Sequence, residues 1–404
     1  MKPLLGAIYP YAFFLLYLII PFDNYIRVLP NILLATLVVA FPFVVAKADF
    51  NKLKTPPVIL FLGFFLFLII DAIVFGRLES DFNIIKKVLI AVGLVLLYLP
   101  VIDVGKIKKA IIFSSIAAII FSAINIVIDN NISGDLIFEN YPRLIESLLI
   151  DRIYLGFLSV LSILISYQSL RPKYHPDNRY YLANIIVNIL FLLLIVSKIA
   201  ILILLLLLVL RQFYGQNKKI RLFVTLLVLV VVSIVFLVVK DDIKTNEFLT
   251  TRTQASDSYI KNTLTWDIRT VVWHCAIEVA METGITFEGL GFTGTKDKLI
   301  TCYSTVIEDP QKSDLFISER YNTHNQFIDF YLSSGFIALG LFLGLLISLF
   351  IRIRRNYFAT ALLLVFISYC CMENVFHRQL GAYYAGFVLI ILLTDSWKIK
   401  TLRE

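Results

Sequence analysis

Charged residues are scarce in this chain of 404 amino acids. They make up 16% of the sequence, and 59% of the residues are hydrophobic, with a mean hydropathy of +0.84. A soluble domain of ordinary composition has roughly a quarter of its residues charged. The shortage of charge therefore excludes an ordinary soluble protein and indicates an integral membrane protein.

Histidine and cysteine are also sparse, with four residues of each. No set of histidine, cysteine and carboxylate residues has the spacing of a metal site, so we expect no catalytic metal and no cofactor. Cys370 and Cys371 fall in an apolar run, where we expect them to pack in the core. Cys275 and Cys302 lie in a segment expected outside the membrane, where an oxidising compartment permits a disulfide, although their spacing does not require one.

The sequence also lacks a strong internal repeat, a low-complexity tail and, near its first apolar run, a small-residue cleavage site. That run follows directly on Met-Lys-Pro. We therefore expect it to be retained as a helix and not removed as a signal peptide.

Long apolar runs, by contrast, are abundant. About 20 apolar residues cross a bilayer as an α-helix, because a helix satisfies its backbone polar groups internally. We predict an all-α membrane protein with about twelve transmembrane helices, near residues 4–20, 30–46, 57–75, 86–102, 109–128, 152–169, 181–197, 199–211, 222–239, 328–351, 357–372 and 381–397. The runs at 181–197 and 199–211 are joined only by Ser197-Lys198 and could form one long helix, which would change the topology of everything downstream.

The distribution of basic residues supports twelve spans with both termini in the cytoplasm. In that topology, 20 of the 37 lysine and arginine residues are cytoplasmic, 8 lie on short outer segments and 9 lie in one long loop that the positive-inside rule discounts. This bias explains the formal net charge of +8, so we infer no nucleic-acid partner from it.

The topology divides the chain into three regions. Transmembrane helices one to nine occupy 1–239, a large periplasmic loop occupies 240–324, and the last three helices with a short cytoplasmic tail occupy 325–404. In the loop, apolar residues at helical spacing predict an amphipathic helix over 265–283 that ends before Gly284.

A formal G-x-G-x-x-G motif follows that helix, at Gly289, Gly291 and Gly294. A dinucleotide site needs a strand before the motif and a helix after it. Because a helix precedes it here, we interpret the glycines as turn geometry.

Ionisable residues inside or at the edge of a span are costly and usually functional. Lys198 lies between two apolar runs, Arg152 opens a span, and His324 stands where the polar loop meets a span. Lys198 could instead be a snorkelling residue, and Arg152 a plain helix-end charge. His324 could be a polar cap on the next helix, but Asn322 or Thr323 could cap that helix without it.

Three further ionisable residues, Glu373, His377 and Arg378, precede the last span. Glu373 and His377 are one helical turn apart, as are Asn374 and Arg378, so each pair could share a helix face. The alternative for Glu373 is an ion pair that locks two helices together.

Together these residues suggest one site on the outer face. Guanidinium groups match phosphate oxygens in bidentate fashion, so a basic cluster beside lipid suits a diphosphate headgroup. A neutral histidine nearby can accept a proton from a sugar hydroxyl. The predicted site has His324 as its base and a basic, diphosphate-binding set of Arg269, Lys198, Arg152, Arg320 and Arg378.

The order of the motifs is informative. It runs Ser197-Lys198 between two spans, Arg269-x-x-x-Trp273, Gly289-x-Gly291, His324-Asn325 opening a span that contains Gly335, and Met372-Glu373-Asn374 before the last span. This order resembles the O-antigen ligase and O-antigen polymerase superfamily of bacterial envelope glycosyltransferases. The resemblance covers most of residues 150–390, whereas the first 130 residues share only hydrophobicity.

The resemblance implies a GT-C-like helical bundle in the bacterial inner membrane, with its active site facing the periplasm. It implies an inverting, metal-independent transfer of glycan from undecaprenyl diphosphate to a sugar acceptor, with His324 as base and Asn325 and Glu373 in support. The family's usual Ser-Arg is Ser197-Lys198 here, and lysine keeps the charge but loses the planar fork.

The sequence leaves the identity of the acceptor open. We expect an O-antigen ligase that acts on lipid A-core in lipopolysaccharide biosynthesis, but an O-antigen or capsule polymerase, which extends another lipid-linked repeat unit, and a protein O-oligosaccharyltransferase share these motifs. A polysaccharide transporter or flippase also fits twelve spans, but it would not need an outer loop over 240–324 that ends in a histidine.

Overall fold

The computed structural model describes residues 2–133, 147–172, 175–215, 268–284 and 287–401. Within these ranges every regular element is helical. Eleven of the twelve predicted spans overlap helices of the structure, and the other, 222–239, lies outside the described residues. These helices are α1 (Lys2–Ile19), α2 (Leu29–Val44), α3 (Pro56–Val74), α4 (Leu78–Leu97), α5 (Gly105–Ser133), α7 (Arg152–Ser169), α8 (Asn178–Leu194), α9 (Lys198–Phe213), α16 (Gln326–Ile353), α17 (Tyr357–Met372) and α18 (Gln379–Thr401).

Several of these helices are long and apolar enough to cross a membrane. Four meet both criteria in the described part of the chain: Leu4–Phe22, Pro56–Val74, Gly105–Asp129 and Gln326–Ile353. A fifth candidate joins α2 to the 3₁₀ helix η2 (Lys47–Lys54) across a bend of 112°. The all-helical class is therefore confirmed, whereas the number of spans stays a prediction.

The boundaries of α4 differ from the predicted span at 86–102. The helix begins at Leu78 with Glu79 and Asp81 in its first turn, where negative charge stabilises a helix N-terminus. It ends at Leu97, shortly before Pro100, which disfavours helical backbone in the residue that precedes it. The apolar pattern therefore located the helix but placed its start too late.

The runs joined by Ser197-Lys198 form two helices, α8 and α9. The turn between them contains Val196 at φ 45°, a left-handed conformation that β-branched residues rarely adopt. The N–H of Ser197 donates to the carbonyl of Leu192 at 3.2 Å, which closes the turn. A single long helix across this position is therefore excluded.

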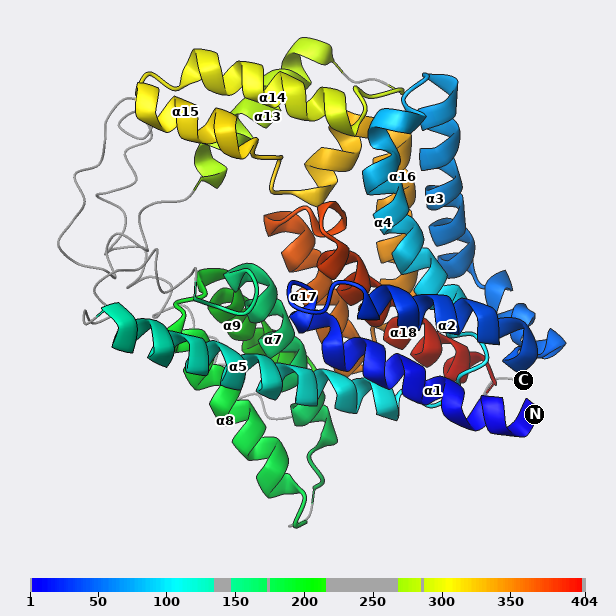
Figure 1. The fold of residues 1–404 in the computed structure, drawn as a ribbon. Helices are drawn as coiled ribbons and strands as arrows, with labels where there is room; N and C mark the ends of the chain where they lie inside the picture. The colour runs from blue at the N-terminus through cyan, green and yellow to red at the C-terminus, as the bar shows by residue number, and fades with distance from the viewer. Residues whose placement is uncertain (1, 134–146, 173–174, 216–267, 285–286, 402–404) are drawn as a thin grey trace.

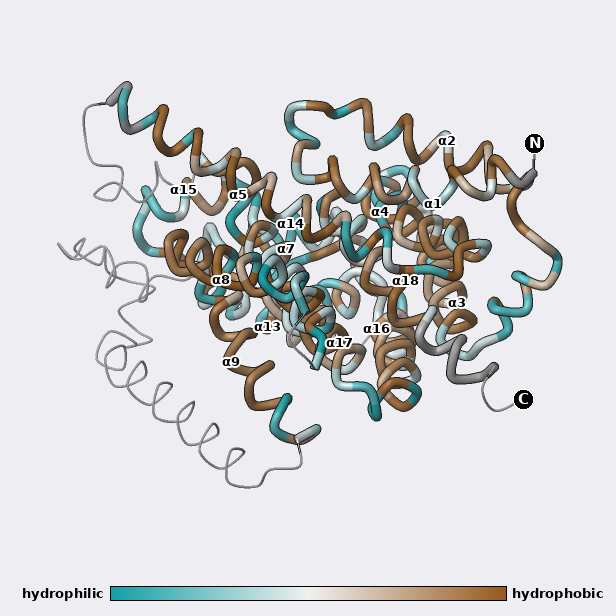
Figure 2. The backbone as a smooth tube through the Cα atoms, turned by 90° about the horizontal axis from the view of Figure 1, so that it is seen from below, coloured by the Kyte–Doolittle hydropathy of each residue, from teal (hydrophilic) through white to brown (hydrophobic). Residues whose placement is uncertain are grey.

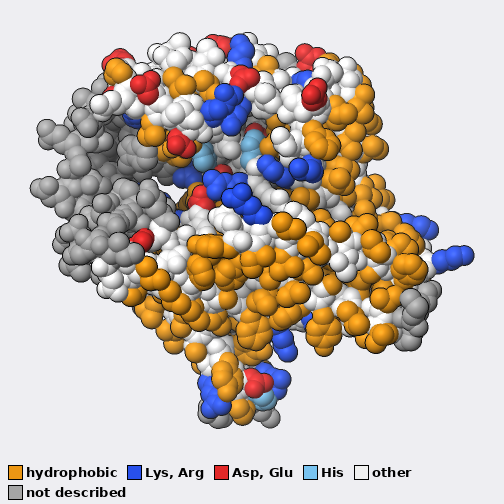
Figure 3. Space-filling model, in the orientation of Figure 1, with side chains coloured by type: hydrophobic (Ala, Val, Ile, Leu, Met, Phe, Trp, Pro, Cys, Tyr) orange, Lys and Arg blue, Asp and Glu red, His pale blue; other side chains and the backbone are white. Residues whose placement is uncertain are grey.

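The helices are arranged in groups around a large apolar core. In Figure 1, α3, α4 and α16 stand side by side, α1, α2, α5 and α18 lie below them, and α7, α8 and α9 pack together on the other side. Figure 2 shows apolar residues along much of α9 and α16. Hydrophobic side chains cover the lower part of the face in Figure 3, whereas charged side chains gather on its upper part.

The upper layer in Figure 1, called the outer layer from here on, consists of α13 (Arg269–Thr283), α14 (Phe292–Val306) and α15 (Pro310–Glu319), and its helix α14 packs against α4 and α16. This layer has its own apolar core, which includes Val272, Leu299 and Phe316. Helix α13 confirms the predicted helix from Arg269 to its end before Gly284, whose φ is 71°, and residues 265–267 lie outside the described residues.

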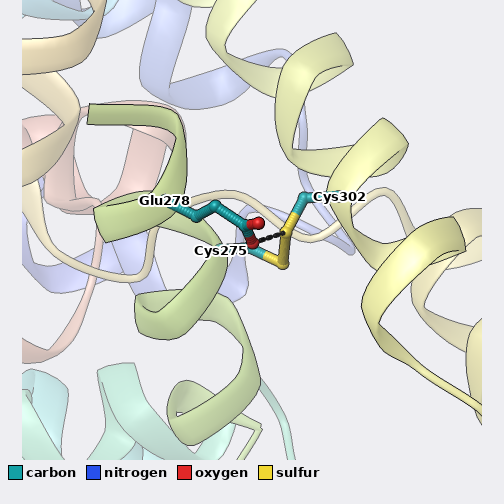
Figure 4. A group of neighbouring side chains, drawn as sticks. All are labelled: Cys275, Glu278 and Cys302. Atoms are coloured by element: carbon teal, nitrogen blue, oxygen red, sulfur yellow. Dashed lines mark hydrogen bonds between the residues drawn. A yellow bond between two sulfur atoms is a disulfide. The ribbon is translucent and has the colours of Figure 1, made fainter. Parts of the chain in front are cut away.

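A disulfide between Cys275 and Cys302 joins α13 to α14, which answers a question that the spacing left open. The carboxylate of Glu278 lies beside it, with Oε2 at 3.3 Å from Cys302 Sγ (Figure 4). These three residues are the one cluster of potential metal ligands in the described part of the chain. Because both sulfurs are bonded to each other, the cluster offers no thiolate to a metal.

The glycine motif docks on a break in α16. Gly335, at φ 73°, interrupts that helix, and the carbonyls of Leu332 and Ser333 accept hydrogen bonds from Leu290 N (2.7 Å) and Gly291 N (2.8 Å). Gly289 has φ 62°, and a Cβ there would lie 2.5 Å from the backbone of Ser333. Gly289 and Gly291 therefore supply turn geometry, as predicted, and Gly289 also permits close backbone contact. Gly294 lies within α14 instead.

Two residues of the first helices hold this loop in place. Arg77 donates to the carbonyls of Glu288 (2.8 Å) and Gly289 (2.7 Å) and pairs with Asp71 at 2.9 Å. Asp81 accepts from the backbone N–H groups that begin α14, at 2.9 Å from Phe292 N. The N-terminal helices thus position the outer layer, in addition to packing in the apolar core.

Candidate active site

His324 lies on a tight turn that leads into α16. Its φ of 42° is left-handed, and its backbone N–H donates to Asn322 Oδ1 at 3.1 Å. Asn325 is the N-cap of α16, and its side chain accepts from Phe327 N at 3.0 Å. The expectation that Asn322 or Thr323 caps this helix is wrong, because the chain turns at His324 and only Asn325 faces the free N–H groups. The imidazole is thus held at the mouth of the helix without serving as its cap.

Glu373 is the partner of this histidine. Its Oε2 lies 3.1 Å from His324 Nδ1, and the two side chains are 8% and 13% exposed. Its Oε1 accepts from Asn374 N at 3.1 Å. Since a carboxylate accepts the Nδ1 proton, the other nitrogen, Nε2, carries the lone pair. No hydrogen bond to Nε2 occurs within the described residues, so it is available to a substrate.

The carboxylate of Glu373 is held in its charged form. Burial raises the pKa of Glu373. The hydrogen bond from His324 and the charges of His324 and Arg269 lower this pKa by a larger amount, so the net pKa lies below the ordinary value. A charged carboxylate fixes the tautomer of His324 and stabilises the imidazolium that forms when Nε2 takes a proton.

Arg269 reaches the same place from the outer layer. It is the first residue of α13, and its Nε donates to the carbonyl of Met372 at 2.9 Å, one residue before Glu373. Because its guanidinium lowers the pKa of Glu373, its charge acts directly on the pair. The structure therefore brings together His324, Glu373 and Arg269.

Lys198 and Arg152 begin two helices that pack against each other. Lys198 is the first residue of α9, and Arg152 is the first residue of α7 after the N-cap Asp151. A Cβ on Gly156 of α7 would lie 2.7 Å from Ser197 Oγ, so the start of α9 packs against the first turns of α7. These two basic residues thus lie at neighbouring helix starts.

The other two predicted arginines are held by carboxylates. Arg378 Nη1 lies 3.1 Å from Asp151 Oδ2, and Arg320 Nη2 lies 2.7 Å from Asp297 Oδ1. Arg378 also lies over the ring of Tyr154, with its Cζ 5.8 Å from the centroid. Both guanidiniums are more than half exposed, so their ion pairs are weak and can be exchanged for a ligand.

The segment that holds Glu373 is not an α-helix. Glu373 and Arg378 have extended backbone, and only η4 (Val375–His377) between them is a 3₁₀ turn. The expectation that Glu373 and His377 share a helix face is therefore wrong, as it is for Asn374 and Arg378. The extended backbone instead sends Glu373 to His324 and His377 to a different acid.

That acid is Asp329, in the first turn of α16. His377 Nε2 lies 2.9 Å from Asp329 Oδ2, and the aspartate is 2% exposed. Asn322 bridges the two pairs, because its Nδ2 approaches His377 Nδ1 at 3.4 Å while its Oδ1 accepts from His324 N. Two histidine–carboxylate pairs therefore flank the start of α16.

An apolar cavity of about 240 Å³ begins close to this helix start. It lies between α16 and α17, and its first lining residue, Phe327, follows His324 by three positions. The other lining residues include Leu343, Leu346, Ile347, Phe350, Leu363 and Ile367. The polar site thus opens beside a surface suited to a hydrocarbon chain.

The model of the O-antigen ligase family matches residues 183–343. The resemblance to the O-antigen ligase and polymerase superfamily is confirmed. The matched segment contains Lys198, Arg269, Gly289 and His324 and ends within α16, before Glu373. A comparison with curated proteins found no match. The match covers less than half of the chain and shows that this segment is similar to O-antigen ligase proteins.

Several residues in and around the matched segment escaped the sequence analysis. Asp329 is an acid inside a predicted span, so the argument applied to Lys198 would have found it. Asp71 carries the same signal. Arg77 and Asp81 lie at the edge of spans in the part of the chain that the family match does not cover, and only the fold shows that they hold the glycine loop.

Proposed function

We propose that this protein is a periplasm-facing, inverting glycosyltransferase that moves glycan from undecaprenyl diphosphate to a sugar hydroxyl, and that it is an O-antigen ligase whose acceptor is lipid A-core. The observation that carries the proposal is the His324–Glu373 pair at 3.1 Å, with Arg269 bonded one residue away. This arrangement holds a base and a cation at one helix start.

The chemistry balances without a further reactant. His324 Nε2 accepts the proton of the acceptor hydroxyl, and the hydroxyl oxygen forms a bond to the anomeric carbon of the donor. The bond from that carbon to the diphosphate breaks, and its electron pair leaves on undecaprenyl diphosphate. Attack opposite the leaving group inverts the configuration. Proton removal by a positioned base contributes roughly 10²- to 10⁴-fold to such a rate.

Cations stabilise the charge that develops on the leaving diphosphate. Arg269 lies closest to the proposed base, and Lys198 and Arg152 stand at neighbouring helix starts. We assign these three to the donor diphosphate, with Arg320 and Arg378 as further contacts. Groups placed in advance around a leaving anion lower the barrier, because they need no reorganisation during the reaction.

The apolar cavity supports a lipid-linked donor. A polyprenyl chain laid between α16 and α17 would end at Phe327, which places its diphosphate beside His324. We further propose that the reaction takes place at the periplasmic surface of the inner membrane, with both termini of the chain in the cytoplasm. The same cavity would serve a polymerase or a protein O-oligosaccharyltransferase, so the acceptor separates these subclasses.

The test is transfer from purified undecaprenyl-diphosphate glycan to lipid A-core, to a second lipid-linked repeat unit and to a protein acceptor, with EDTA present. Two variants are compared with the wild type. His324→Asn is the sharper one, because asparagine tolerates the positive φ of this position while lacking a base, whereas His324→Ala also strains the turn. Loss of transfer in a folded His324→Asn protein supports the base assignment.

Each outcome assigns a subclass or removes the proposal. Transfer to lipid A-core establishes a ligase, and extension of the lipid-linked unit establishes a polymerase. Full transfer by His324→Asn would eliminate His324 as the base. If no acceptor is glycosylated while lipid-linked glycan crosses proteoliposome membranes, the protein is a transporter.

A further inference from the structure

A second group of cations lies on the other side of the segment 373–378. Lys87 of α4 donates a hydrogen bond from Nζ to the carbonyl of His377, which places it next to Arg378. Asp81 of α4 accepts hydrogen bonds from the backbone N–H groups that begin α14, which brings the first turns of α14, where Lys296 lies, against α4. The charges of Lys86, Arg378 and Lys296 all act on Lys87. Lysine and arginine side chains surround a hollow in Figure 3 in which histidine side chains are visible. Three separate elements, α4, α14 and the 373–378 segment, therefore converge on one basic patch.

The patch, defined here as Lys87, Lys296 and Arg378, has too few acids to balance it. Arg378 is paired with Asp151, but Lys87 and Lys296 form no ion pair with a carboxylate in the described part of the chain. Both lysines are half-buried. Burial lowers the pKa of Lys296, and the charge of Arg320 lowers it further while Asp297 opposes the shift. Crowded, partly desolvated cations repel one another, and a bound anion removes that repulsion.

The patch and the proposed donor site meet at Arg378. Glu373, at one end of the 373–378 segment, faces His324 and Arg269, whereas Arg378, at the other end, pairs with Asp151 and its charge also acts on Lys87 of α4. Lys87 and Lys296 have no part in the proposed donor site. These two lysines can therefore bind another anion.

The position of the patch favours binding of the acceptor there. His377 lies between Lys87 and Asp329, and Asp329 belongs to the first turn of the helix that His324 precedes. The patch and the proposed base thus flank the same helix start. A molecule that binds an anionic group in the patch can present a nearby hydroxyl to His324.

We propose that Lys87, Lys296 and Arg378 form a second anion site that binds a phosphate group. The phosphate belongs either to the acceptor glycolipid, which rests on the proposed function, or to a membrane lipid. Lysine ammonium groups bind phosphate as point charges, and Arg378 adds a planar fork once it releases Asp151. The site selects phosphorylated over neutral partners.

The test uses the double variant Lys87→Gln/Lys296→Gln in the full-length protein, with Lys298→Gln as the control. Lys298 lies two residues from Lys296 on α14, is exposed, and has the same charge. Transfer is measured with a phosphorylated acceptor and with the same acceptor after dephosphorylation. We expect the double variant to raise KM for the phosphorylated acceptor by roughly tenfold or more, because two charge-assisted contacts are lost. KM for the donor and for the dephosphorylated acceptor stays at the wild-type value.

A binding measurement separates this inference from the proposed function. Thermal unfolding is followed with a soluble phosphorylated disaccharide, and lipid retention is measured in nanodiscs of phosphatidylglycerol or phosphatidylcholine. Stabilisation by the disaccharide that the double variant loses supports an acceptor phosphate even if no transfer occurs. Selective loss of phosphatidylglycerol retention, with acceptor KM unchanged, assigns the site to a lipid. The second site would be overturned if the acceptor KM, the stabilisation by the disaccharide and the phosphatidylglycerol retention were the same in wild type, the double variant and Lys298→Gln.

Discussion

His324 Nδ1 and Glu373 Oε2 lie 3.1 Å apart, although 49 residues separate them in the chain. The turn before α16 supplies the imidazole, and the extended residue after α17 supplies the carboxylate. The pair fixes which ring nitrogen carries the proton. Two helix ends that pack together thus bring an imidazole and a carboxylate into contact.

Glu373→Gln should reduce transfer by about tenfold to a hundredfold, which is less than His324→Asn. An amide can still accept from Nδ1, but it does not stabilise the imidazolium. The measurement is kcat for wild type, Glu373→Gln and His324→Asn at saturating donor. Activity of Glu373→Gln equal to the wild type would show that the carboxylate has no part in the reaction.

Glu373 should also make stability depend on pH. Burial raises its pKa, but the bond from His324 and the charges of His324 and Arg269 outweigh burial, so the folded pKa lies below the ordinary 4.5. The charged carboxylate therefore stabilises the fold above pH 4.5, and this contribution is lost as pH falls through the folded pKa. Thermal unfolding of wild type and Glu373→Gln in detergent should show the wild-type advantage narrowing below pH 4.5. A Tm difference between wild type and Glu373→Gln that grows as the pH falls would contradict this prediction.

The glycine loop offers a matched pair of substitutions. Gly289→Ala combines a φ of 62° with a Cβ at 2.5 Å from the backbone of Ser333, whereas Gly284→Ala has a φ of 71° and nothing within 4 Å. A non-glycine residue in a sparsely populated backbone region costs about 1–3 kcal/mol. We expect Gly284→Ala to lower Tm modestly and Gly289→Ala to lower it more and to undock the loop. If both substitutions lowered Tm equally, the close approach of Gly289 to α16 would contribute nothing to stability.

Reduction of the Cys275–Cys302 disulfide should destabilise the outer layer. The bridge closes a loop of 27 residues between α13 and α14, and such a cross-link contributes roughly 3 kcal/mol. Dithiothreitol should therefore lower the Tm of the wild type but not of Cys275→Ser/Cys302→Ser. Thiol labelling of the unfolded wild type should give two free cysteines, Cys370 and Cys371. Four labelled thiols without reductant would contradict the bridge.

The apolar cavity should affect only donors that carry a long chain. Ile347 lines it and is 57% exposed, so Ile347→Trp fills the space with little effect on folding. Ile351, also 57% exposed and on the same helix, does not line it and provides the control Ile351→Trp. We expect Ile347→Trp to raise KM for the undecaprenyl donor about tenfold, but not KM for a short-chain analogue. The same KM change with both donors would place the lipid elsewhere.

The sequence by itself determined the helical membrane class and most helix positions, because hydrophobicity and its period are local properties of consecutive residues. It also singled out His324 and Lys198, since isolated ionisable groups at the edge of apolar runs stand out without any knowledge of the fold, and it singled out Arg269 through the basic outer loop and the order of the motifs. The role of each stays a prediction, because the geometry shows neighbours and not a reaction.

The tertiary structure decided which of these groups meet. Helical spacing suggested Glu373 with His377, but the backbone after α17 is extended, so each residue pairs with a group from another element. Spacing could not choose the disulfide, nor show that Arg77 holds a loop more than two hundred residues away. Such contacts depend on how helices pack, and no pattern of neighbouring residues contains that information.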